Sequence, residues 1–293
     1  MGSDAVLVVL AAGRARRYGG VKPLAPIGVG GEAVIDLLAA DAIRAGFSTL
    51  VLVVGPATGP AIRYHVERTW PEWIDVRFAV QTRPLGTVHA VLAAAGHLRE
   101  GAAFGVANAD DCYGVNGLTR LAERLRGHGR PNSLVAYRLR NAVIGQSPVS
   151  RGICEVDDTG ALRSLVERNL VQPTADGRFL SGDGTEPAEI DGDVLVSMNL
   201  WGFGTEMLDL LGSAMASADA SDRDVEVLLP QVVGQALAEG TVVGELPTRF
   251  DVISVEDRCI GVTHPEDLTL VQQEVARQIG RGERAAVLWP VAM

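Results

Sequence analysis

The residues from 10 to 28 combine glycine with positive charge directly after a short apolar run. The stretch LAAGRARRYGGVKPLAPIG overlaps the end of the run Ala5–Leu10. Its basic residues are Arg14, Arg16, Arg17 and Lys22. Glycine allows a backbone to approach a ligand closely, and free N–H groups together with cations suit the oxygen atoms of a phosphate. The stretch matches neither G-x-x-x-x-G-K-[ST] nor G-x-G-x-x-G, which argues against a simple P-loop and against a dinucleotide-dependent dehydrogenase. We therefore predict a phosphate-binding loop of another kind.

Two adjacent carboxylates offer a second kind of chemistry. Asp110 and Asp111 stand in the stretch VANADDCYG, directly after the strand-like segment Ala103–Ala107. Hard divalent cations such as Mg²⁺ take oxygen ligands, and the ligands of open α/β sheets collect at the carboxyl ends of the strands. We predict a Mg²⁺ site here, with Asp110 as the first ligand and Asp111 as the second.

The opening stretch resembles the signature of the sugar-phosphate nucleotidylyltransferases, such as the glucose-1-phosphate uridylyl- and thymidylyltransferases. Gly13, Arg17, Lys22 and Pro23 match its positions, although Arg17 and Lys22 are closer in sequence than in many members. Molybdopterin nucleotidyltransferases and related cytidylyltransferases share the motif. The resemblance extends over about residues 5–270. It implies an enzyme that joins a nucleoside triphosphate to a sugar 1-phosphate and releases pyrophosphate.

The resemblance also implies which residues bind the nucleotide. In the stretch QTRPLGTVHA, Gln81 and Gly86 resemble the base-reading positions of the family, where a glutamine amide and a glycine backbone hydrogen-bond the edge of a pyrimidine. This resemblance favours UTP or dTTP as the donor. The full set of implied nucleotide-binding residues is Leu10, Ala11, Ala12, Gly13, Gln81, Gly86, Thr87 and Asn108.

Later segments fall in the order of the family's sugar-phosphate site. By resemblance, Gly152 would contact the sugar through its backbone, and Glu167 would accept hydrogen bonds from its hydroxyls. Arg168 would hold the phosphate where the family usually has lysine, and Asn199 would add a polar contact. Arginine and lysine bind phosphate with different geometry. Because Asn199 also sits later than the family's asparagine, we expect an unusual acceptor.

The second metal-binding aspartate of many family members has no counterpart at its usual place. In the stretch CIGVTHP, Gly261 occupies that place, and Asp251 is the nearest substitute, whereas Asp267 is a first-turn helix acid. The predicted metal ligands are therefore Asp110, Asp111 and Asp251. The missing aspartate also leaves open a regulatory homologue that binds a sugar nucleotide without turnover.

The implied reaction is an in-line attack of a sugar-phosphate oxygen on the α-phosphorus of the triphosphate. Catalysis then consists of charge neutralisation and the alignment of two anions. The implied catalytic residues are Arg17 for the departing pyrophosphate, Lys22 for the α-phosphate and the incoming phosphate, and Asp110 for Mg²⁺. A cytidylyl- or guanylyltransferase acting on a non-sugar phosphate or an alcohol remains the alternative enzyme.

Short apolar runs alternate with segments of helical spacing in the first half of the chain. The predicted strands are Ala5–Leu10, Thr49–Val54, Val76–Val80, Ala103–Ala107 and Ser133–Tyr137. The predicted helices are Ala33–Ala45, Gly86–Leu98 and Leu118–Arg126. Such alternation is typical of a mostly parallel sheet with helices on both faces. Together with the resemblance, it predicts a three-layer, Rossmann-like α/β nucleotidyltransferase fold with a mostly parallel, mixed central sheet.

The regular alternation of strand-like and helical segments ends after residue 150. The strand-like segments are now Gly152–Val156, Val194–Phe203 and Thr241–Pro247. Residues 171–193 are rich in Gly, Asp, Thr and Pro and are predicted to form a surface excursion with a small hairpin. Asp224–Glu239 and Pro265–Ile279 are predicted to be amphipathic helices, the second with Thr263 as its N-cap.

The absence of a repeat or an obvious linker predicts one domain over residues 1–293. Its predicted parts are a nucleotide-binding half (1–115), a sugar-phosphate-binding half (116–260), and a C-terminal helix and tail (261–293).

Composition and charge narrow the partners. With 47% hydrophobic residues, 21% charged residues and a net charge of −10, the chain has a globular composition and no general basic face for nucleic acid. No apolar stretch reaches the ~18–20 residues that span a membrane. The three cysteines show no metal or disulfide spacing, as expected of reduced thiols in the cytoplasm. The expected partners are a nucleoside triphosphate and a sugar phosphate, with a homodimer as the default assembly.

Overall fold

The computed structural model describes residues 5–13, 19–127, 129, 131–221, 225–243, 246–262 and 265–289. Arg17 and Thr263 lie outside the described residues, so the predictions for these two positions find no test in the fold. No helix in the described ranges is long and apolar enough to cross a bilayer.

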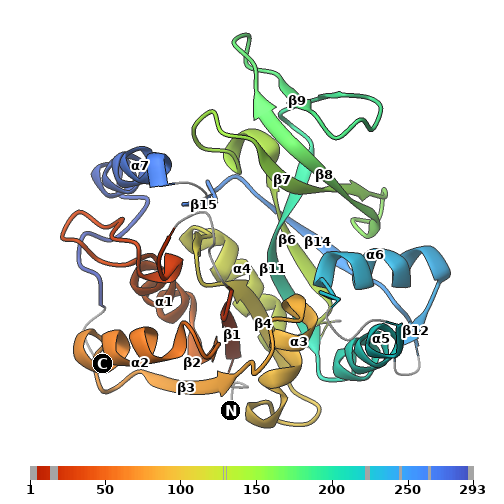
Figure 1. The fold of residues 1–293 in the computed structure, drawn as a ribbon, viewed down its shortest axis with the longest axis horizontal. Coiled ribbons are helices and arrows are strands. Elements are labelled where there is room, and N and C mark those ends of the chain that lie inside the picture. The colour runs from red at the N-terminus through yellow and green to blue at the C-terminus, as the bar shows by residue number, and fades with distance from the viewer. Residues whose placement is uncertain are drawn as a thin grey trace.

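An eleven-stranded mixed sheet forms the middle of the molecule (Figure 1). Its first part is parallel and runs in the order β4-β1-β2-β3, with the bounds β4 (Ala103–Asn108), β1 (Ala5–Ala11), β2 (Phe47–Val54) and β3 (Asp75–Val80). Since parallel strands point the same way, their carboxyl ends lie together at one edge of the sheet.

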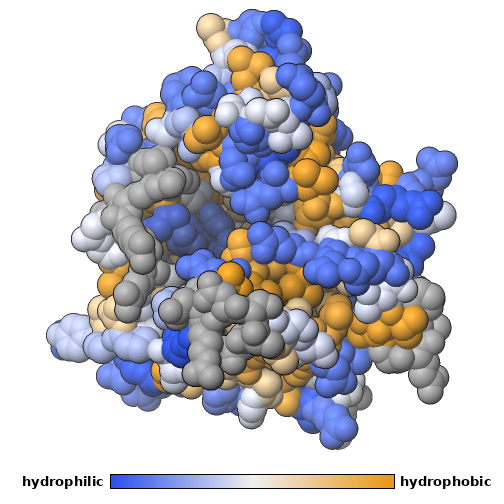
Figure 2. All heavy atoms as spheres, turned by 45° about the vertical axis from the view of Figure 1, so that its right-hand side comes forward, coloured by the Kyte–Doolittle hydropathy of each residue, from blue (hydrophilic) through white to orange (hydrophobic). Residues whose placement is uncertain are grey.

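The strand β11 (Leu195–Gly204) joins this parallel part to the rest of the sheet and changes partners along its length. Trp201–Gly204 pair with β4, whereas Leu195–Ser197 pair with β7 (Val149–Val156). The sheet therefore forks beside residues 198–200, at the level where β4 ends. The face drawn in Figure 2 is hollowed at about the height of β15 and the end of β1, and hydrophilic side chains line the hollow.

Antiparallel and parallel pairs extend the sheet beyond β11. On one side, β7 continues into β8 (Leu162–Pro173), β9 (Phe179–Ser181) and β10 (Glu189–Ile190). On the other, β11 pairs with β6 (Ser133–Arg138), which pairs in parallel with β14 (Asp251–Val255). The predicted excursion at 171–193 thus contains the end of β8 and the β9–β10 hairpin.

Helices cover both faces of the sheet, which confirms the three-layer α/β prediction. Alternate residues of β1 point to opposite faces, so that Leu7 and Val9 belong to one apolar cluster and Val8 to another. The first cluster includes residues of α1 (Val34–Ala45), α2 (Gly59–Thr69) and α4 (Val115–Arg126). The second includes residues of α3 (Gly86–Ala93), α5 (Met207–Ser221) and α6 (Leu229–Glu239).

Short elements connect these layers. They are η1 (Lys22–Leu24), η2 (Ala95–His97), β5 (Asp111–Cys112), η3 (Leu139–Asn141), the hairpin of β12 (Val242–Val243) with β13 (Leu246–Pro247), β15 (Ile260–Gly261) and η4 (Pro265–Asp267). The last helix, α7 (Leu268–Gly280), packs with residues of α1, β5 and β15. The C-terminal helix therefore packs against elements from the first half of the chain.

Two predicted helices differ from the observed ones. The segment predicted as Asp224–Glu239 is helical only from Leu229, and Pro230 stands in its first turn, where a missing N–H costs nothing. Val227, ahead of the helix, instead hydrogen-bonds with the backbones of Leu85 and Val88. The segment Gly86–Leu98 is divided into α3 and η2. The helices α2 and α5 and the strand β8 are absent from the predicted elements.

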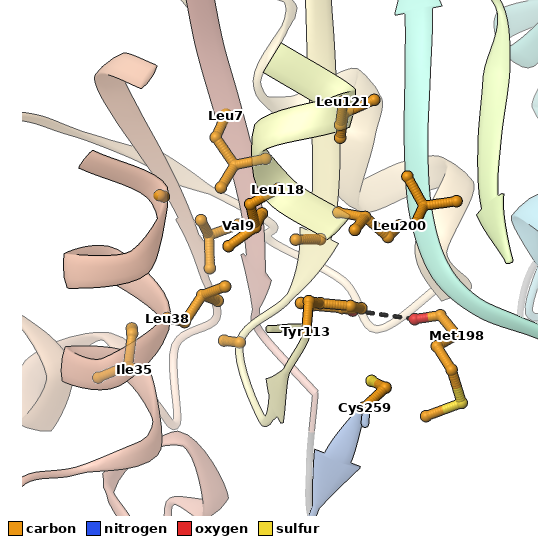
Figure 3. Packing of buried hydrophobic residues seen from close by; sticks show 14 of the residues in the cluster. Leu7, Val9, Ile35, Leu38, Tyr113, Leu118, Leu121, Met198, Leu200 and Cys259 are labelled. Carbon is orange, nitrogen blue, oxygen red and sulfur yellow. Dashed lines mark hydrogen bonds between the residues drawn. The ribbon is translucent and has the colours of Figure 1, made fainter. Parts of the chain in front are cut away.

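The buried hydroxyl of Tyr113 links the two sides of the fork in the sheet (Figure 3). It accepts a hydrogen bond from the Asn108 backbone N–H (2.8 Å) and donates one to the Met198 carbonyl (2.9 Å). In turn, Tyr137 donates from its hydroxyl to the Tyr113 carbonyl (2.8 Å). The end of β4 is thereby held against the partner exchange of β11.

Tyr113→Phe should destabilise the fold by roughly 2–3 kcal/mol, because it leaves a buried N–H and a buried carbonyl without a partner. Urea unfolding of the two proteins measures the difference. Tyr64→Phe is the matched control, since the Tyr64 side chain is 62% exposed. Equal stability of the two variants would contradict the role given to the Tyr113 hydroxyl.

Candidate active site

The predicted nucleotide-binding backbone gathers at the carboxyl ends of the parallel strands. Leu10 at the end of β1 is in register with Val53 on β2 and Asn108 on β4. Its carbonyl accepts from the Ala109 N–H (3.1 Å), and the Gln81 N–H donates to Val54 at the end of β2 (2.9 Å). The structure therefore brings the segments containing Leu10–Gly13, Gln81 and Asn108 to one edge of the sheet, as the sequence predicts.

A buried threonine holds the turn after β1. The Thr58 hydroxyl donates to the Ala11 carbonyl (2.8 Å) and accepts from the Gly55 N–H (3.0 Å). A side chain at Gly55 would come within 3.1 Å of the Ala12 carbonyl, so the absence of a Cβ allows the two backbones to meet. Thr58 and Gly55 were not among the predicted site residues, because a supporting threonine carries no recognisable motif.

Lys22 and Asp110 form the ion pair at the centre of the site. The Lys22 ammonium donates to Asp110 Oδ2 at 2.5 Å, across 88 positions of sequence. Burial alone would lower the pKa of Lys22, but the Asp110 and Asp111 carboxylates favour the ammonium and hold the pKa above its usual value. Lys22 is therefore protonated and positively charged beside the carboxylates that follow β4.

Asp111 is the buried member of the carboxylate pair. Burial and the neighbouring Asp110 raise the pKa of Asp111 to about 6, against the opposing effects of Lys22 and of a hydrogen bond from Asn108 Nδ2 (3.1 Å). A carboxylate that is costly to ionise by itself gains from a nearby cation. The described residues contain no group of three or more His, Cys, Asp or Glu that could hold a metal ion. Two carboxylates still fit Mg²⁺, which is commonly held by one or two together with substrate phosphates.

Gly261 is directly opposite Asp111 in the structure. The strand β15 pairs antiparallel with β5, and Gly261 is in register with Asp111. A Cβ at position 261 would overlap Asp111 Oδ1 and lie 3.0 Å from the Asp110 carbonyl. Asp111 thus fills the space into which a side chain at 261 would project. The site therefore has a second carboxylate, that of Asp111, although position 261 has no aspartate.

Asp251 is not brought to this site, contrary to its expected place among the metal ligands. Asp251 is the first residue of β14 and is in register with Ser133, the first residue of β6. These are the ends of the two strands that are opposite to the site. The Asp251 carboxylate instead pairs with Arg124 Nη1 (3.2 Å) and Arg249 Nε (2.9 Å).

The segment around Gly86 has a rigid support. Gly86 has a φ of +89°, and a Cβ there would lie 2.7 Å from the Val227 nitrogen, so that both the conformation and the space require glycine. Gln81 Nε2 donates one of its two N–H groups to the Gly86 carbonyl (3.0 Å), which leaves Oε1 and the second N–H available among the described residues. The Thr87 hydroxyl accepts from the Leu229 N–H (2.8 Å), and this bond ties the segment to the start of α6.

The predicted acceptor-binding residues differ in how far their side chains are free to contact a ligand. Gly152 on β7 is in register with Glu167 on β8 and with Ser197 on β11, and Glu167 is exposed. Asn199 lies at the irregularity of β11 with a φ of +60°, and its Oδ1 accepts from the Trp201 indole (3.2 Å).

The prediction that Arg168 holds the acceptor phosphate does not fit its contacts. The buried guanidinium donates to the Asp183 carboxylate (3.1 Å) and to the carbonyls of Thr185 (2.6 Å) and Pro187 (3.0 Å). The arginine therefore belongs to the support of the β8–β9 region. Another arginine, Arg151 on β7, stands next to Gly152, and no motif marked it as a site residue.

This fold, with a lysine and two carboxylates at its strand ends, defines an enzyme of the nucleotidyltransferase class. The family described as "MobA-like NTP transferase domain" matches residues 7–172, and the chain belongs to this family. No curated protein matches the chain.

Several solved structures share the fold over nearly the whole chain. The inositol-1-phosphate CTP transferase of T. maritima has a TM-score of 0.66 at 12% identity, over 95% of this chain and 97% of that one. A UDP-glucose pyrophosphorylase complexed with UDP-glucose has a TM-score of 0.64 at 14% identity, over 94% and 99%. HddC from Yersinia pseudotuberculosis, complexed with GMP-PN, has a TM-score of 0.61 at 14% identity, also over 94% and 99%.

Gly261→Ala should lower the rate of nucleotidyl transfer by roughly 10²-fold, because its methyl group must push the Asp111 carboxylate out of place. Pyrophosphate release under saturating substrates measures the effect. Gly96→Ala is the matched control, since a Cβ there meets nothing within 4 Å. If the cause is the shared space, the exchange Asp111→Gly with Gly261→Asp should recover more activity than either change alone. Full activity of Gly261→Ala would contradict this account.

Proposed function

We propose that this nucleotidyltransferase transfers a nucleotidyl group from UTP or dTTP to a sugar 1-phosphate in a Mg²⁺-dependent reaction. The observation that carries the proposal is the Lys22–Asp110–Asp111 cluster at the ends of β1 and β4. Lys22 is also the only lysine of the chain, whose other permanently cationic side chains are all arginines. An ammonium is a compact point charge that fits between several oxygens, which a planar guanidinium does not do equally well.

The reaction needs charge neutralisation more than proton transfer. An oxygen of the acceptor phosphate attacks the α-phosphorus, the bond from that phosphorus to the bridging oxygen breaks, and pyrophosphate leaves. The acceptor phosphate is already anionic, so no general base is required. Lys22 would bind the α-phosphate and the incoming phosphate, and Arg17 would bind the departing pyrophosphate. When bound by Asp110 and Asp111, Mg²⁺ would neutralise phosphate charge.

The free Gln81 Oε1 supports a base with an N–H on its pairing edge. One of the two N–H groups of Gln81 Nε2 donates to the Gly86 carbonyl, so the side chain still offers Oε1 as an acceptor and the second N–H as a donor. Uracil and thymine present N3–H to such an acceptor. A guanine N–H or a cytosine amino group also suits it, and this keeps a cytidylyl- or guanylyltransferase acting on another phosphate or an alcohol as the second candidate.

Pyrophosphate release with Mg²⁺, each common nucleoside triphosphate and a panel of sugar 1-phosphates tests the proposal. Release confined to UTP or dTTP with one sugar phosphate is the expected result, and removal of Mg²⁺ with EDTA should abolish it. Release with CTP or GTP alone would establish the second candidate. Triphosphate binding without any release would favour a regulatory protein over an enzyme of this specificity.

Asp110→Asn should lower the rate by about 10²–10³-fold while the protein stays folded, because it removes one charge from the site. Asp158→Asn is the control, since Asp158 is an exposed carboxylate of the turn between β7 and β8. Pyrophosphate release and thermal unfolding are measured on both variants. Near-normal turnover of Asp110→Asn would overturn the role of this carboxylate.

The single lysine allows a chemical test of the same site. Reductive methylation should modify only Lys22 and the α-amino group, and mass spectrometry of the digested peptides distinguishes the two sites. We expect the triphosphate to protect Lys22, because its phosphates would surround the ammonium. Modification of Lys22 at an equal rate with and without triphosphate, for a protein that binds the triphosphate, would contradict this placement.

A further inference from the structure

Arg151 brings a cation into the region between β7 and the strand ends. Its Nε and Nη2 donate to the Ala142 carbonyl at 3.0 and 2.6 Å, and its Nη1 donates to the Ser150 carbonyl at 2.7 Å. All of these acceptors are neutral backbone oxygens. The guanidinium has five N–H donors, so each of its two Nη atoms keeps one N–H for another ligand.

Arg151 is half-buried and differs from the two buried arginines, Arg168 and Arg284, in having no carboxylate partner among the described residues. Arg168 is paired with Asp183, and Arg284 is paired with Asp41 at 2.5 Å. Arg151 has no carboxylate within ion-pair distance in the described part of the chain, although burial lowers the pKa of its guanidinium. A cation that is partly withdrawn from water and has no charged partner costs free energy, and an anion supplied from outside would offset that cost.

A chain of backbone contacts places Arg151 beside the carboxylate cluster. Its acceptor, Ala142, directly follows η3, and the carbonyl of Asn141 in η3 accepts from the Cys259 N–H (3.0 Å). Cys259 leads into β15, where Gly261 opposes Asp111.

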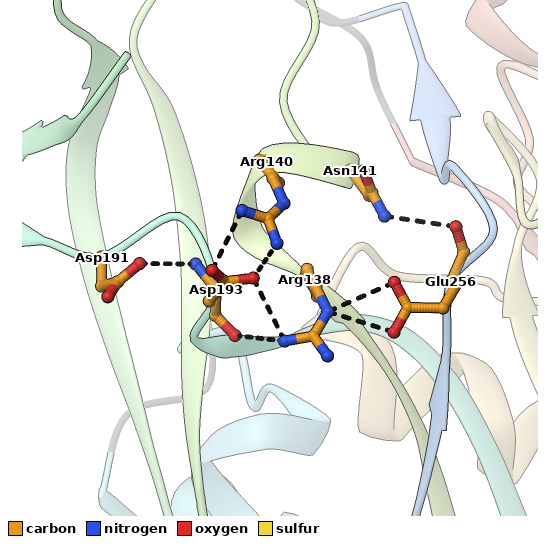
Figure 4. Close-up of polar contacts among 6 residues, drawn as sticks. All are labelled: Arg138, Arg140, Asn141, Asp191, Asp193 and Glu256. Atoms are coloured by element: carbon orange, nitrogen blue, oxygen red, sulfur yellow. Dashed lines mark hydrogen bonds and ion pairs between the residues drawn. The ribbon is translucent and has the colours of Figure 1, made fainter. Parts of the chain in front are cut away.

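Side chains reinforce the link between η3 and the segment before β15 (Figure 4). Asn141 Nδ2 donates to the Glu256 carbonyl (3.2 Å), and Arg138 Nε donates to the Glu256 carboxylate (3.1 Å). Burial and Asp110 raise the pKa of Asp111, and the aspartates hold the pKa of Lys22 above its usual value; Arg151 is near enough to oppose both shifts in part.

We infer that Arg151 binds the phosphate group of the acceptor and positions it for attack. This inference rests on the proposed function and replaces Arg168, whose guanidinium is committed to Asp183 and two carbonyls. Arg151 contacts Ala142, which leads through η3 and Cys259 to Gly261 and Asp111, so a phosphate held by its free N–H groups would lie on the Arg151 side of the carboxylate cluster. A guanidinium can hold two oxygens of one phosphate at once, which fixes the direction of the attacking oxygen.

Steady-state kinetics of Arg151→Gln and Arg151→Lys test the inference, with the sugar 1-phosphate that the wild-type protein uses. The KM for this acceptor should rise about 10- to 100-fold in Arg151→Gln, as expected for the loss of a charged hydrogen-bond donor. The KM for the triphosphate should stay within about twofold, since Arg151 does not contact it. Arg151→Lys keeps the charge without the fork and should show a smaller rise in acceptor KM.

Arg163→Gln on the neighbouring strand β8 is the matched control, because its side chain is 72% exposed. Thermal unfolding of all variants separates lost binding from lost folding. An acceptor KM that is unchanged in Arg151→Gln, or that rises no more than the triphosphate KM, would overturn the inference.

A binding experiment distinguishes this inference from the proposed function. Titration calorimetry with α-D-glucose 1-phosphate and with inorganic phosphate requires no turnover. Weaker binding of both probes to Arg151→Gln than to the wild-type protein supports an acceptor-phosphate site, even if no nucleotidyl transfer is found with any sugar phosphate. Equal binding to the two proteins, or no binding to either, overturns it.

Discussion

The hydrogen bonds of the Tyr113 hydroxyl hold together the two parts of the sheet between which the site lies. They link the end of β4 to the middle of β11 at the level where β11 changes partners, next to the direct pairing of Trp201–Gly204 with β4. In the proposed function, the carboxyl ends of β4, β1, β2 and β3 would bind the phosphates of the nucleotide, and β7, which diverges from β4, would lie on the acceptor side. Apolar side chains pack beside the fork, and hydrophilic side chains line the hollow on the face drawn in Figure 2.

Charge is distributed over this fork in a consistent way. Lys22 is balanced by Asp110 and Asp111, whereas Arg151 has only carbonyl partners among the described residues. This distribution suits the proposed reaction, in which two anions that repel each other must be brought together. Catalysis by alignment and neutralisation depends on such fixed charges, since a group that is already positioned needs no reorganisation during the reaction.

Local sequence patterns were sufficient for the central fold and for the polar residues that follow its strands. The strands β1 to β4, the helix α1 and the positions of Gln81 and Asp110 after strands follow from apolar runs and the residues after them, whereas the roles predicted for Lys22 and Gln81 come from the family resemblance. The start of α6 was wrong because Val227 pairs with Leu85 and Val88, which are distant in sequence. The exposed outer part of β8 lacks a continuous apolar run, so its length depended on pairing with β7.

The sequence by itself determined the class of fold and which polar residues stand after its first strands, because each strand and the residues that follow it are neighbours in the chain. Only the tertiary structure decided which charges meet. Asp111 fills the space beside Gly261, Arg168 is neutralised by Asp183, and Arg151 is left with carbonyls. Each of these outcomes depends on the register between distant strands or on competition for a counter-ion, and neither is written in a local pattern.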